Sequence, residues 1–254
     1  EDKIIVNNID LSIPKGEITM LIGANGCGKS TLLSGMSRLL IPKEGDVLLE
    51  GVSIHDYKAK DLAKKLSILP QGPIAPEGIT VMVFQNYALY PHMTVFDNMA
   101  FGLKLRKVPK AEIEQKVTEA AKILDIEHLL KRKPKALSGG QRQRAWIAMA
   151  LTQNTDILLL DEPTTYLDLA YQIEILELLK DLNKKTKKTI VTVIHELNQA
   201  ARYADNLVCM KKGKIYSQGR VETVFTENML KDVFGVDSIV ILDPITSRPM
   251  CIPK

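Results

Sequence analysis

Aromatic residues, cysteines and long apolar runs are scarce in this sequence. Only 5% of its 254 residues are aromatic, and the three cysteines, Cys27, Cys209 and Cys251, lie far apart. An odd number of cysteines at these spacings predicts neither a disulfide framework nor a zinc site, and it favours a reducing compartment such as the cytoplasm. The apolar runs are far shorter than the roughly 20 residues of a membrane-spanning helix, and no signal peptide opens the chain. We therefore expect no direct membrane insertion, so that any work at a membrane requires docking onto other subunits.

A strong charge of one sign is also absent. The chain has 34 basic and 30 acidic residues, a net charge of +4, which is too even to indicate a nucleic-acid partner. Apolar residues make up 45% of the chain, as in ordinary globular proteins. The length suits one large domain or one domain with an inserted subdomain.

Short apolar runs alternate with helical patterns, which is typical of an α/β fold. The pattern predicts strands at 18–22, 156–160 and 189–194, and helices at 29–40, 140–152, 169–183 and 196–204. A hairpin that turns at Lys212–Gly213 gives the sheet an antiparallel edge, and the C-terminal stretch resembles a strand pair or an edge extension. Residues 94–136 look mostly helical, with a common apolar face formed by Ile113, Val117, Ala121 and Leu124. We expect an α/β core at 1–71 and 137–254, and a loop with a helical subdomain at 72–136.

The stretch GANGCGKST matches the phosphate-binding pattern G-x-x-x-x-G-K-[ST]. Successive glycines let backbone N–H groups turn inward at the start of a helix, where the helix dipole also favours anions. Lys29 is expected to reach the β- and γ-phosphates of a nucleotide, and the Ser30 hydroxyl to ligate magnesium. The predicted nucleotide-binding residues are Gly23, Asn25, Gly26, Cys27, Gly28, Lys29, Ser30 and Thr31. Cys27 is also a candidate for thiol modification that blocks nucleotide binding.

The stretch ILLLDEP places two adjacent carboxylates after a buried strand. Asp161 is expected to bind the metal ion, and Glu162 to face the γ-phosphate. One carboxylate then balances the magnesium charge while the other polarises the attacking water. Glu162 is therefore a candidate catalytic residue.

The stretch LSGGQRQR, residues 137–144, has a serine and paired glycines that open a helix and form a second anion site. Together with the phosphate loop, Asp161–Glu162, TTYLD at 164–168 and His195 after TVI, it resembles in order and spacing the ATPase subunit of ABC transporters. The resemblance covers nearly the whole chain. It implies a P-loop NTPase sheet of the ABC ATPase type, ATP and Mg²⁺ as cofactors, and ATP hydrolysis.

In that family two subunits pair head to tail, so the resemblance implies a homodimer. The signature residues of one subunit would cover the ATP held by the other, and here they are Leu137, Ser138, Gly139, Gly140 and Gln141. The resemblance also implies that Asp168 couples the two sites. It assigns His195 to a contact with the γ-phosphate and the attacking water, although a lone histidine after an apolar strand is most often structural. Membrane permease partners would dock on the helical subdomain, which places the chain at the inner face of the cell membrane.

An aromatic residue that stacks on adenine is expected in this family upstream of the first strand. The sequence has no Tyr, Phe or Trp before Tyr57. Stacking a base on an aromatic ring is worth on the order of 1–3 kcal/mol, so we expect ATP affinity to be about five- to a hundredfold lower.

Residues 66–95 contain one pattern twice. A shift of 14 positions places Gln71 on Gln85, with the tetrads Leu66–Leu69 and Val81–Phe84 in nearly the same relation. In the family one strand ends at a glutamine that faces the γ-phosphate and contributes to the metal site. Gln71 and Gln85 are therefore both catalytic candidates, and the candidate metal ligands are Ser30, Asp161 and Gln71.

Only one position in the sheet is vacant for the two tetrads. If Leu66–Leu69 takes it, the second tetrad is surplus apolar surface; if Val81–Phe84 takes it, residues 66–80 are looped out. Looping out costs little free energy, whereas each fully exposed apolar side chain costs about 1.5–3 kcal/mol. We favour Leu66–Leu69 with Gln71, because this strand follows its own helix.

The doubled segment coincides with a change of resemblance. Residues 1–80 and 145–254 resemble ATPases of iron-siderophore, haem and cobalamin importers, and residues 81–136 resemble those of maltose-type sugar importers, whereas LSGGQRQR suits both. We interpret the chain as a chimera of the two branches, with a natural tandem duplication as the alternative.

The leading interpretation is the ATPase subunit of an iron-siderophore-type importer with a grafted sugar-importer segment. A folded nucleotide-binding module with little or no turnover is the alternative. A soluble ABC ATPase of DNA repair or translation is disfavoured, because those chains usually carry long coiled-coil insertions or tandem cassettes.

Overall fold

The structure is a computed structural model that describes residues 4–69, 89–165 and 167–254. The chain divides into two compact units, Glu1–His55 with Leu179–Lys254, and Asp56–Leu178. Gln71, Gln85 and the tetrad Val81–Phe84 lie outside the described residues. The predicted domain boundaries at 71/72 and 136/137 stay predictions.

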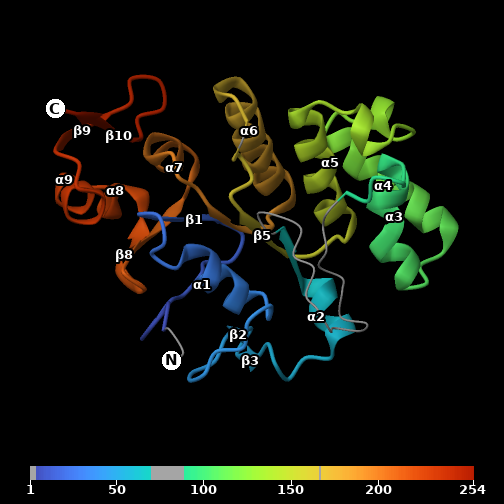
Figure 1. Ribbon diagram of the computed structural model, residues 1–254, viewed down its shortest axis with the longest axis horizontal. Helices are drawn as coiled ribbons and strands as arrows, with labels where there is room; N and C mark the ends of the chain where they lie inside the picture. The colour runs from blue at the N-terminus through green and yellow to red at the C-terminus, as the bar shows by residue number, and fades with distance from the viewer. Residues whose placement is uncertain (1–3, 70–88, 166) are drawn as a thin grey trace. The chain divides into compact units, whose positions relative to one another are not determined.

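The first unit is built on parallel strands with an antiparallel edge (Figure 1). β1 (Ile18–Gly23) lies between β6 (Thr189–Val193) and β7 (Asn206–Lys211) and is parallel to both, whereas β8 (Lys214–Arg220) pairs antiparallel with β7. All residues of β1 and β6 are buried, as expected for parallel strands covered on both faces. The turn at Lys212–Gly213 is confirmed, and so is the predicted fold class.

Helices and short elements complete the first unit. α1 (Lys29–Met36) and α7 (Leu197–Tyr203) contact β1, and the two-residue strands β2 (Leu48–Leu49) and β3 (Val52–Ser53) form a small hairpin. After β8 come α8 (Val221–Val224), α9 (Glu227–Met229) and a π-turn, η3 (Leu230–Phe234). The prediction that the first helix runs to Leu40 is wrong. The helix ends at Met36 because Arg38 takes a left-handed backbone, φ 64°.

A two-stranded hairpin follows in the C-terminal part of the chain, as predicted. β9 (Ser238–Leu242) pairs antiparallel with β10 (Pro249–Pro253), which contacts α7. On the outer edge of β10, the Asn198 side chain accepts a hydrogen bond from Cys251 N at 2.8 Å and donates one to Cys251 O at 3.1 Å. On the outer edge of β9, Glu227 Oε1 accepts a hydrogen bond from Val240 N at 3.1 Å. Side chains thus cover backbone groups on both edges of the hairpin.

The described residues of the second unit form two parallel strands and a group of helices. β4 (Leu66–Leu69), which follows α2 (Ala59–Lys65), pairs with β5 (Ile157–Asp161). Leu66–Leu69 therefore takes the sheet position beside β5, as the favoured alternative predicts. Which glutamine faces the nucleotide stays a prediction.

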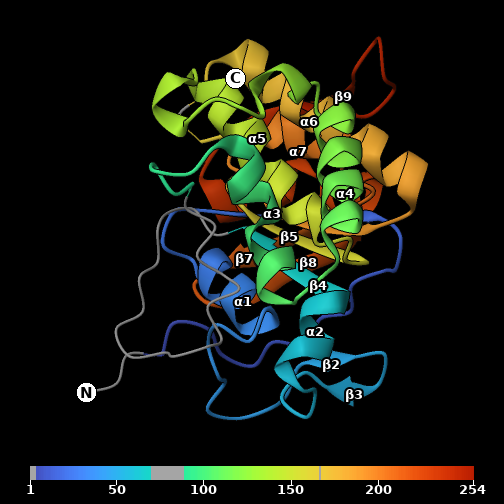
Figure 2. The same ribbon diagram turned by 90° about the vertical axis from the view of Figure 1, so that its right-hand side faces the viewer.

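α3 (Val95–Leu105), α4 (Lys110–Ile123) and α5 (Gly139–Thr152) pack against one another (Figures 1 and 2). Two short 3₁₀ turns, η1 (Glu127–Leu129) and η2 (Pro134–Ala136), lie between α4 and α5. The predicted apolar face is confirmed, because all of its members are buried: Ile113, Val117, Ala121 and Leu124. α6 (Leu169–Thr186) runs from the second unit into the first.

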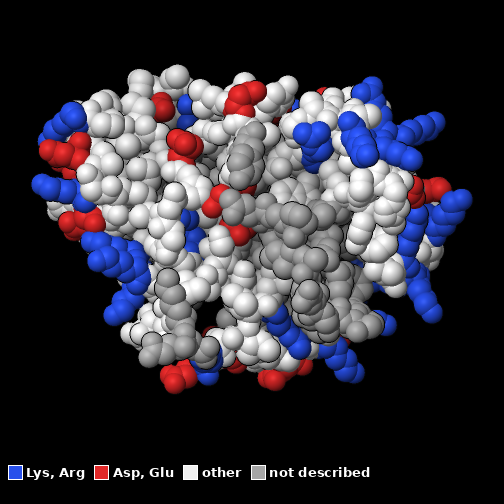
Figure 3. Space-filling model, in the orientation of Figure 1, with Lys and Arg blue, Asp and Glu red and all other residues white. Residues whose placement is uncertain are grey.

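Within the described ranges, no helix is long and apolar enough to span a bilayer. On the face shown in Figure 3, acidic side chains occur together with the Lys and Arg side chains. The surface of this face agrees with the nearly balanced charge of the sequence.

Candidate functional site

The phosphate loop joins the end of β1 to the start of α1 in the first unit. Its glycines have backbone angles that other residues rarely adopt, with φ values of 73° at Gly26 and 102° at Gly28. A Cβ on Gly23 would lie 2.4 Å from Met210 O, and one on Gly28 would lie 2.8 Å from Val6 Cγ2. Side chains at these two positions would collide with these neighbouring atoms, so the close packing of the loop depends on glycine.

Lys29, the first residue of α1, folds its side chain back over the loop. The side chain is buried, and Nζ donates hydrogen bonds to Gly23 O at 2.8 Å and to Ala24 O at 3.3 Å. An ammonium group held by two carbonyl oxygens can exchange them for the oxygens of an anion. The loop and this lysine together fit a nucleotide phosphate chain.

One cysteine is part of the loop, and a second lies on the strand beside it. Cys27 is only 5% exposed, and its carbonyl accepts a hydrogen bond from Gly213 N at 3.0 Å. Cys209 pairs with Ile22 across β7 and β1. Burial, with a smaller contribution from Cys27, raises the pKa of the Cys209 thiol to about 12. Cys209 therefore stays a neutral thiol at neutral pH.

The two adjacent carboxylates are in the second unit, where β5 ends. Asp161 is 7% exposed, and Glu162 has a left-handed backbone with φ 52°. Thr165 bonds the glutamate twice, because its N donates to Glu162 O at 3.2 Å and its Oγ1 donates to Glu162 Oε2 at 2.9 Å. The turn after β5 therefore fixes both the backbone and the carboxylate of Glu162.

The signature residues form the start of α5, also in the second unit. Ser138 is the N-cap, and a capping box joins it to Gln141: Gln141 N donates to Ser138 Oγ at 3.3 Å, and Ser138 N donates to Gln141 Oε1 at 3.1 Å. A Cβ on Gly140 would lie 2.8 Å from the Tyr171 ring, and one on Gly139 would lie 4.0 Å from Leu167. Gly140 therefore lets the Tyr171 ring approach the helix closely, whereas a Cβ on Gly139 would make only an ordinary contact.

Asp168 and His195 have different surroundings. Asp168 precedes α6, and its Oδ1 accepts a hydrogen bond from Tyr171 N at 3.2 Å, so it caps this helix. His195 is exposed, shortly after β6 in the first unit. The first unit thus carries 23–31 and His195, and the second carries 137–141, Asp161, Glu162 and Asp168. Their predicted roles toward a nucleotide stay predictions.

Gln143 is a residue that the motif reading did not single out, although it lies within LSGGQRQR. Its Nε2 donates a hydrogen bond to Pro163 O at 2.5 Å, which joins α5 to the turn that follows β5. The only sequence signal was its place in the signature stretch, one helical turn after the paired glycines.

A magnesium ion fits these residues only together with a bound nucleotide. In the part of the chain that the structure describes, no group of three or more His, Cys, Asp or Glu residues could hold a metal ion by itself. Magnesium keeps several water ligands and takes one or two carboxylates together with phosphate oxygens. Asp161 supplies a carboxylate of this kind, and Ser30 supplies the hydroxyl that the phosphate-loop pattern assigns to magnesium.

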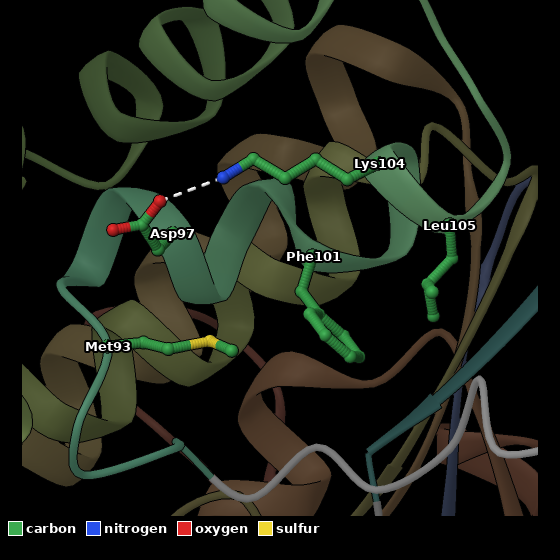
Figure 4. A pocket seen from close by; sticks show the side chains of 5 residues that line it. All are labelled: Met93, Asp97, Phe101, Lys104 and Leu105. Atoms are coloured by element: carbon green, nitrogen blue, oxygen red, sulfur yellow. Dashed lines mark hydrogen bonds and ion pairs between the residues drawn. The ribbon is translucent and has the colours of Figure 1, made fainter.

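A cavity of about 340 Å³ lies along α3 in the second unit (Figure 4). Its lining residues are Met93, Asp97, Phe101, Lys104 and Leu105. The Lys104 ammonium and the Asp97 carboxylate form an ion pair at 2.8 Å. This pair bounds a mostly apolar hollow, and 53% of the Leu105 surface is exposed.

Comparisons with known proteins agree with this geometry. The family model described as ABC transporter matches residues 6–165, more than half of the chain. The chain is 49% identical over 99% of its length, and 88% of the relative's, to the probable siderophore transport system ATP-binding protein YusV of Bacillus subtilis. It is 42% identical over 88% of its length, and 58% of the relative's, to the oligosaccharides import ATP-binding protein MsmX of the same organism.

A solved structure is similar in fold and in sequence. It is the dimeric, post-hydrolysis state of the ATP-binding cassette MJ0796 bound to ADP and Pi, with a TM-score of 0.70 and 31% identity over 85% of this chain and 90% of that one. The phosphate loop, the paired carboxylates and the capped signature helix occur here in a chain that these comparisons match over most of its length. The chain therefore belongs to the ABC transporter family, and it is one of the ATPases of that family.

Proposed function

We propose that this chain is the ATP-hydrolysing subunit of an ABC importer of the iron-siderophore type. The similarity to a siderophore transport ATP-binding protein over nearly the whole chain carries this proposal. The Glu162 carboxylate after β5 supports hydrolysis over mere binding, because a module that only binds a nucleotide needs no group to polarise water. The phosphate loop would serve either function.

The chemistry divides among a few residues. Lys29 and the loop N–H groups hold the phosphates, and Ser30 and Asp161 would hold Mg²⁺, which neutralises charge on the phosphate oxygens. Glu162 polarises the attacking water, and His195 orients the water and the γ-phosphate. Gln71 or Gln85 completes the site.

Hydrolysis takes place in a head-to-tail homodimer, in which Ser138 and the paired glycines of one subunit contact the γ-phosphate held by the other. The start of α5 suits this role, since its N-terminal N–H groups and helix dipole favour an anion. The dimer of the MJ0796 cassette supports this assembly.

The partner is a membrane permease that ATP hydrolysis moves. The chain then lies at the inner face of the cell membrane. The contact is on the helical subdomain, for which the apolar cavity along α3 offers a surface. We further propose that residues 81–136 are a sugar-importer segment grafted onto a siderophore-type chain. The resemblance of this segment alone carries that part, because the similarity to MsmX extends over 88% of this chain and does not distinguish the segment.

The test is ATPase activity measured against protein concentration. A site shared by two subunits gives an upward curve of activity against concentration.

Two variants test the site residues. Lys29→Ala abolishes both ATP binding and turnover, whereas Glu162→Gln abolishes turnover while ATP binding persists. A linear dependence would refute the shared site, and ATP binding without any turnover in the wild-type chain would favour the binding module instead. Comparison of Gln71→Ala with Gln85→Ala then identifies the glutamine that turnover requires.

A further inference from the structure

We propose that Gln143 is a positioning residue that ties the catalytic turn at Glu162 to the signature turn of the same chain. The hydrogen bond from Gln143 Nε2 to Pro163 O, 2.5 Å long, carries the inference. Gln143 lies on α5 about one turn after the paired glycines, and Pro163 directly follows Glu162. The inference rests on the proposed hydrolysis in a dimer.

The turn at Glu162 needs an external support. A left-handed backbone at a residue with a side chain costs free energy, and Glu162 has φ 52°. The two bonds from Thr165 lie within the turn itself. Proline has no N–H, so the carbonyl of Pro163 is the one backbone group through which another element can fix this residue by a hydrogen bond.

The signature turn is rigidly joined to Gln143. The capping box between Ser138 and Gln141 closes the first turn of α5, and the helix beyond it has a buried face that includes Ala145 and Ala148. Five residues at 1.5 Å each place Gln143 about 7.5 Å along the axis from the cap. A displacement of the cap therefore moves the Gln143 amide and, through it, the Pro163 carbonyl.

The link has a consequence for the dimer. In the proposed assembly the signature of a subunit contacts one ATP, whereas its Glu162 acts on the other. Gln143 then connects the two sites through a single subunit, so that occupation of one site favours the productive Glu162 geometry at the other. Such a connection appears as cooperativity in ATP hydrolysis.

The experiment compares Gln143→Met with Gln143→Lys. Methionine keeps the length of the side chain and removes the donor, whereas lysine keeps a donor of similar reach. Gln115→Met is the matched control, because Gln115 is exposed on α4 and bonds only Glu119 among the contacts described. The assays are kcat, the Hill coefficient and ATP affinity, together with amide hydrogen exchange of residues 161–168.

We expect Gln143→Met to lower kcat about three- to tenfold, the effect of one lost hydrogen bond. ATP affinity stays at the wild-type value, the Hill coefficient falls toward one, and exchange in 161–168 becomes faster. Gln143→Lys restores most of the activity, and Gln115→Met changes nothing.

Several results would overturn the inference. One is an unchanged kcat, Hill coefficient and exchange rate in Gln143→Met; another is a parallel loss of ATP affinity, which would indicate general damage. If the wild-type chain does not hydrolyse ATP, the proposed function fails by itself, and hydrogen exchange still decides whether Gln143 holds the turn.

Discussion

Two helix caps that share one side-chain-to-backbone hydrogen bond allow the structural and functional roles of Ser138 to be separated. Ser138 Oγ accepts a hydrogen bond from Gln141 N at 3.3 Å, and Thr94 Oγ1 accepts one from Asp97 N at 3.1 Å. Both caps start helices of the second unit, α5 and α3. Only Ser138 belongs to the signature. Ser138→Ala and Thr94→Ala therefore both remove the bond to the backbone N–H, and Thr94→Ala also removes the hydrogen bond from Thr94 Oγ1 to Asp97 Oδ2 at 2.7 Å. Their expected effects on activity differ.

The magnitudes follow from the geometry. Removal of a Ser or Thr cap costs about 0.5–2 kcal/mol of the free energy of unfolding. For a chain of this size 1 kcal/mol lowers Tm by about 2–4 °C, so each variant should melt a few degrees below wild type. A donor or dipole that stabilises transition-state charge is worth roughly a hundredfold or more in kcat. Ser138→Ala should show this second loss and Thr94→Ala should not.

The assay pairs thermal unfolding with steady-state ATP hydrolysis on the same preparations. The reasoning requires similar shifts of Tm in both variants and a large loss of kcat in Ser138→Ala alone. A comparable loss of kcat in Thr94→Ala would show that activity follows the stability of the second unit. Wild-type kcat in Ser138→Ala would exclude the serine from the γ-phosphate contact.

Three further outcomes are expected. Gly213→Ala should lower the free energy of unfolding by at least about 2 kcal/mol, because φ is 78° and the new Cβ would lie 2.2 Å from a backbone oxygen; urea unfolding measures this, and an unchanged midpoint would contradict it. Maleimide should modify Cys27 slowly, and ATP should protect it, while Cys209, with a pKa of about 12, stays unmodified in the native chain. Mass spectrometry locates the label. Full labelling of Cys27 without loss of ATP binding would refute the expectation for Cys27. Hydrogen bonds from Lys104 and Thr94 lower the pKa of Asp97 below its ordinary value of 3.8. The ionised carboxylate therefore stabilises the fold above pH 3.8, and this stabilisation is lost as the pH falls through the folded pKa. Asp97→Asn should destabilise the protein at pH 7 and differ less from wild type in acid, as unfolding measured at both pH values would show.

Much of the fold was predictable because local chemistry decides it. Buried parallel strands appear as continuous apolar runs, as at β1 and β5, and a helix with Ile113 and Val117 on one face has a clear period. The turn at Lys212–Gly213 needs positive φ, which glycine permits. These features depend on neighbours in the sequence.

The missed features depend on contacts between distant residues or on a single backbone angle. The end of α1 is set by the left-handed Arg38, which has no glycine or proline to announce it. The bond from Gln143 to Pro163 joins residues 20 positions apart, and no spacing rule predicts it. The doubled tetrads left two alternatives open, and the favoured one, with Leu66–Leu69 beside β5, is confirmed, whereas the choice of glutamine stays a prediction.

The hairpin formed by β9 and β10 is also protected against self-association. A two-stranded sheet has two edges, and an exposed edge can add a strand from another molecule and begin an aggregate. Asn198 occupies both the N–H and the carbonyl of Cys251, and Glu227 occupies the N–H of Val240, so an incoming strand would have to displace these side chains first. Loss of the Asn198 amide would therefore show itself as a shorter soluble lifetime in concentrated or heated samples, before any loss of ATP binding.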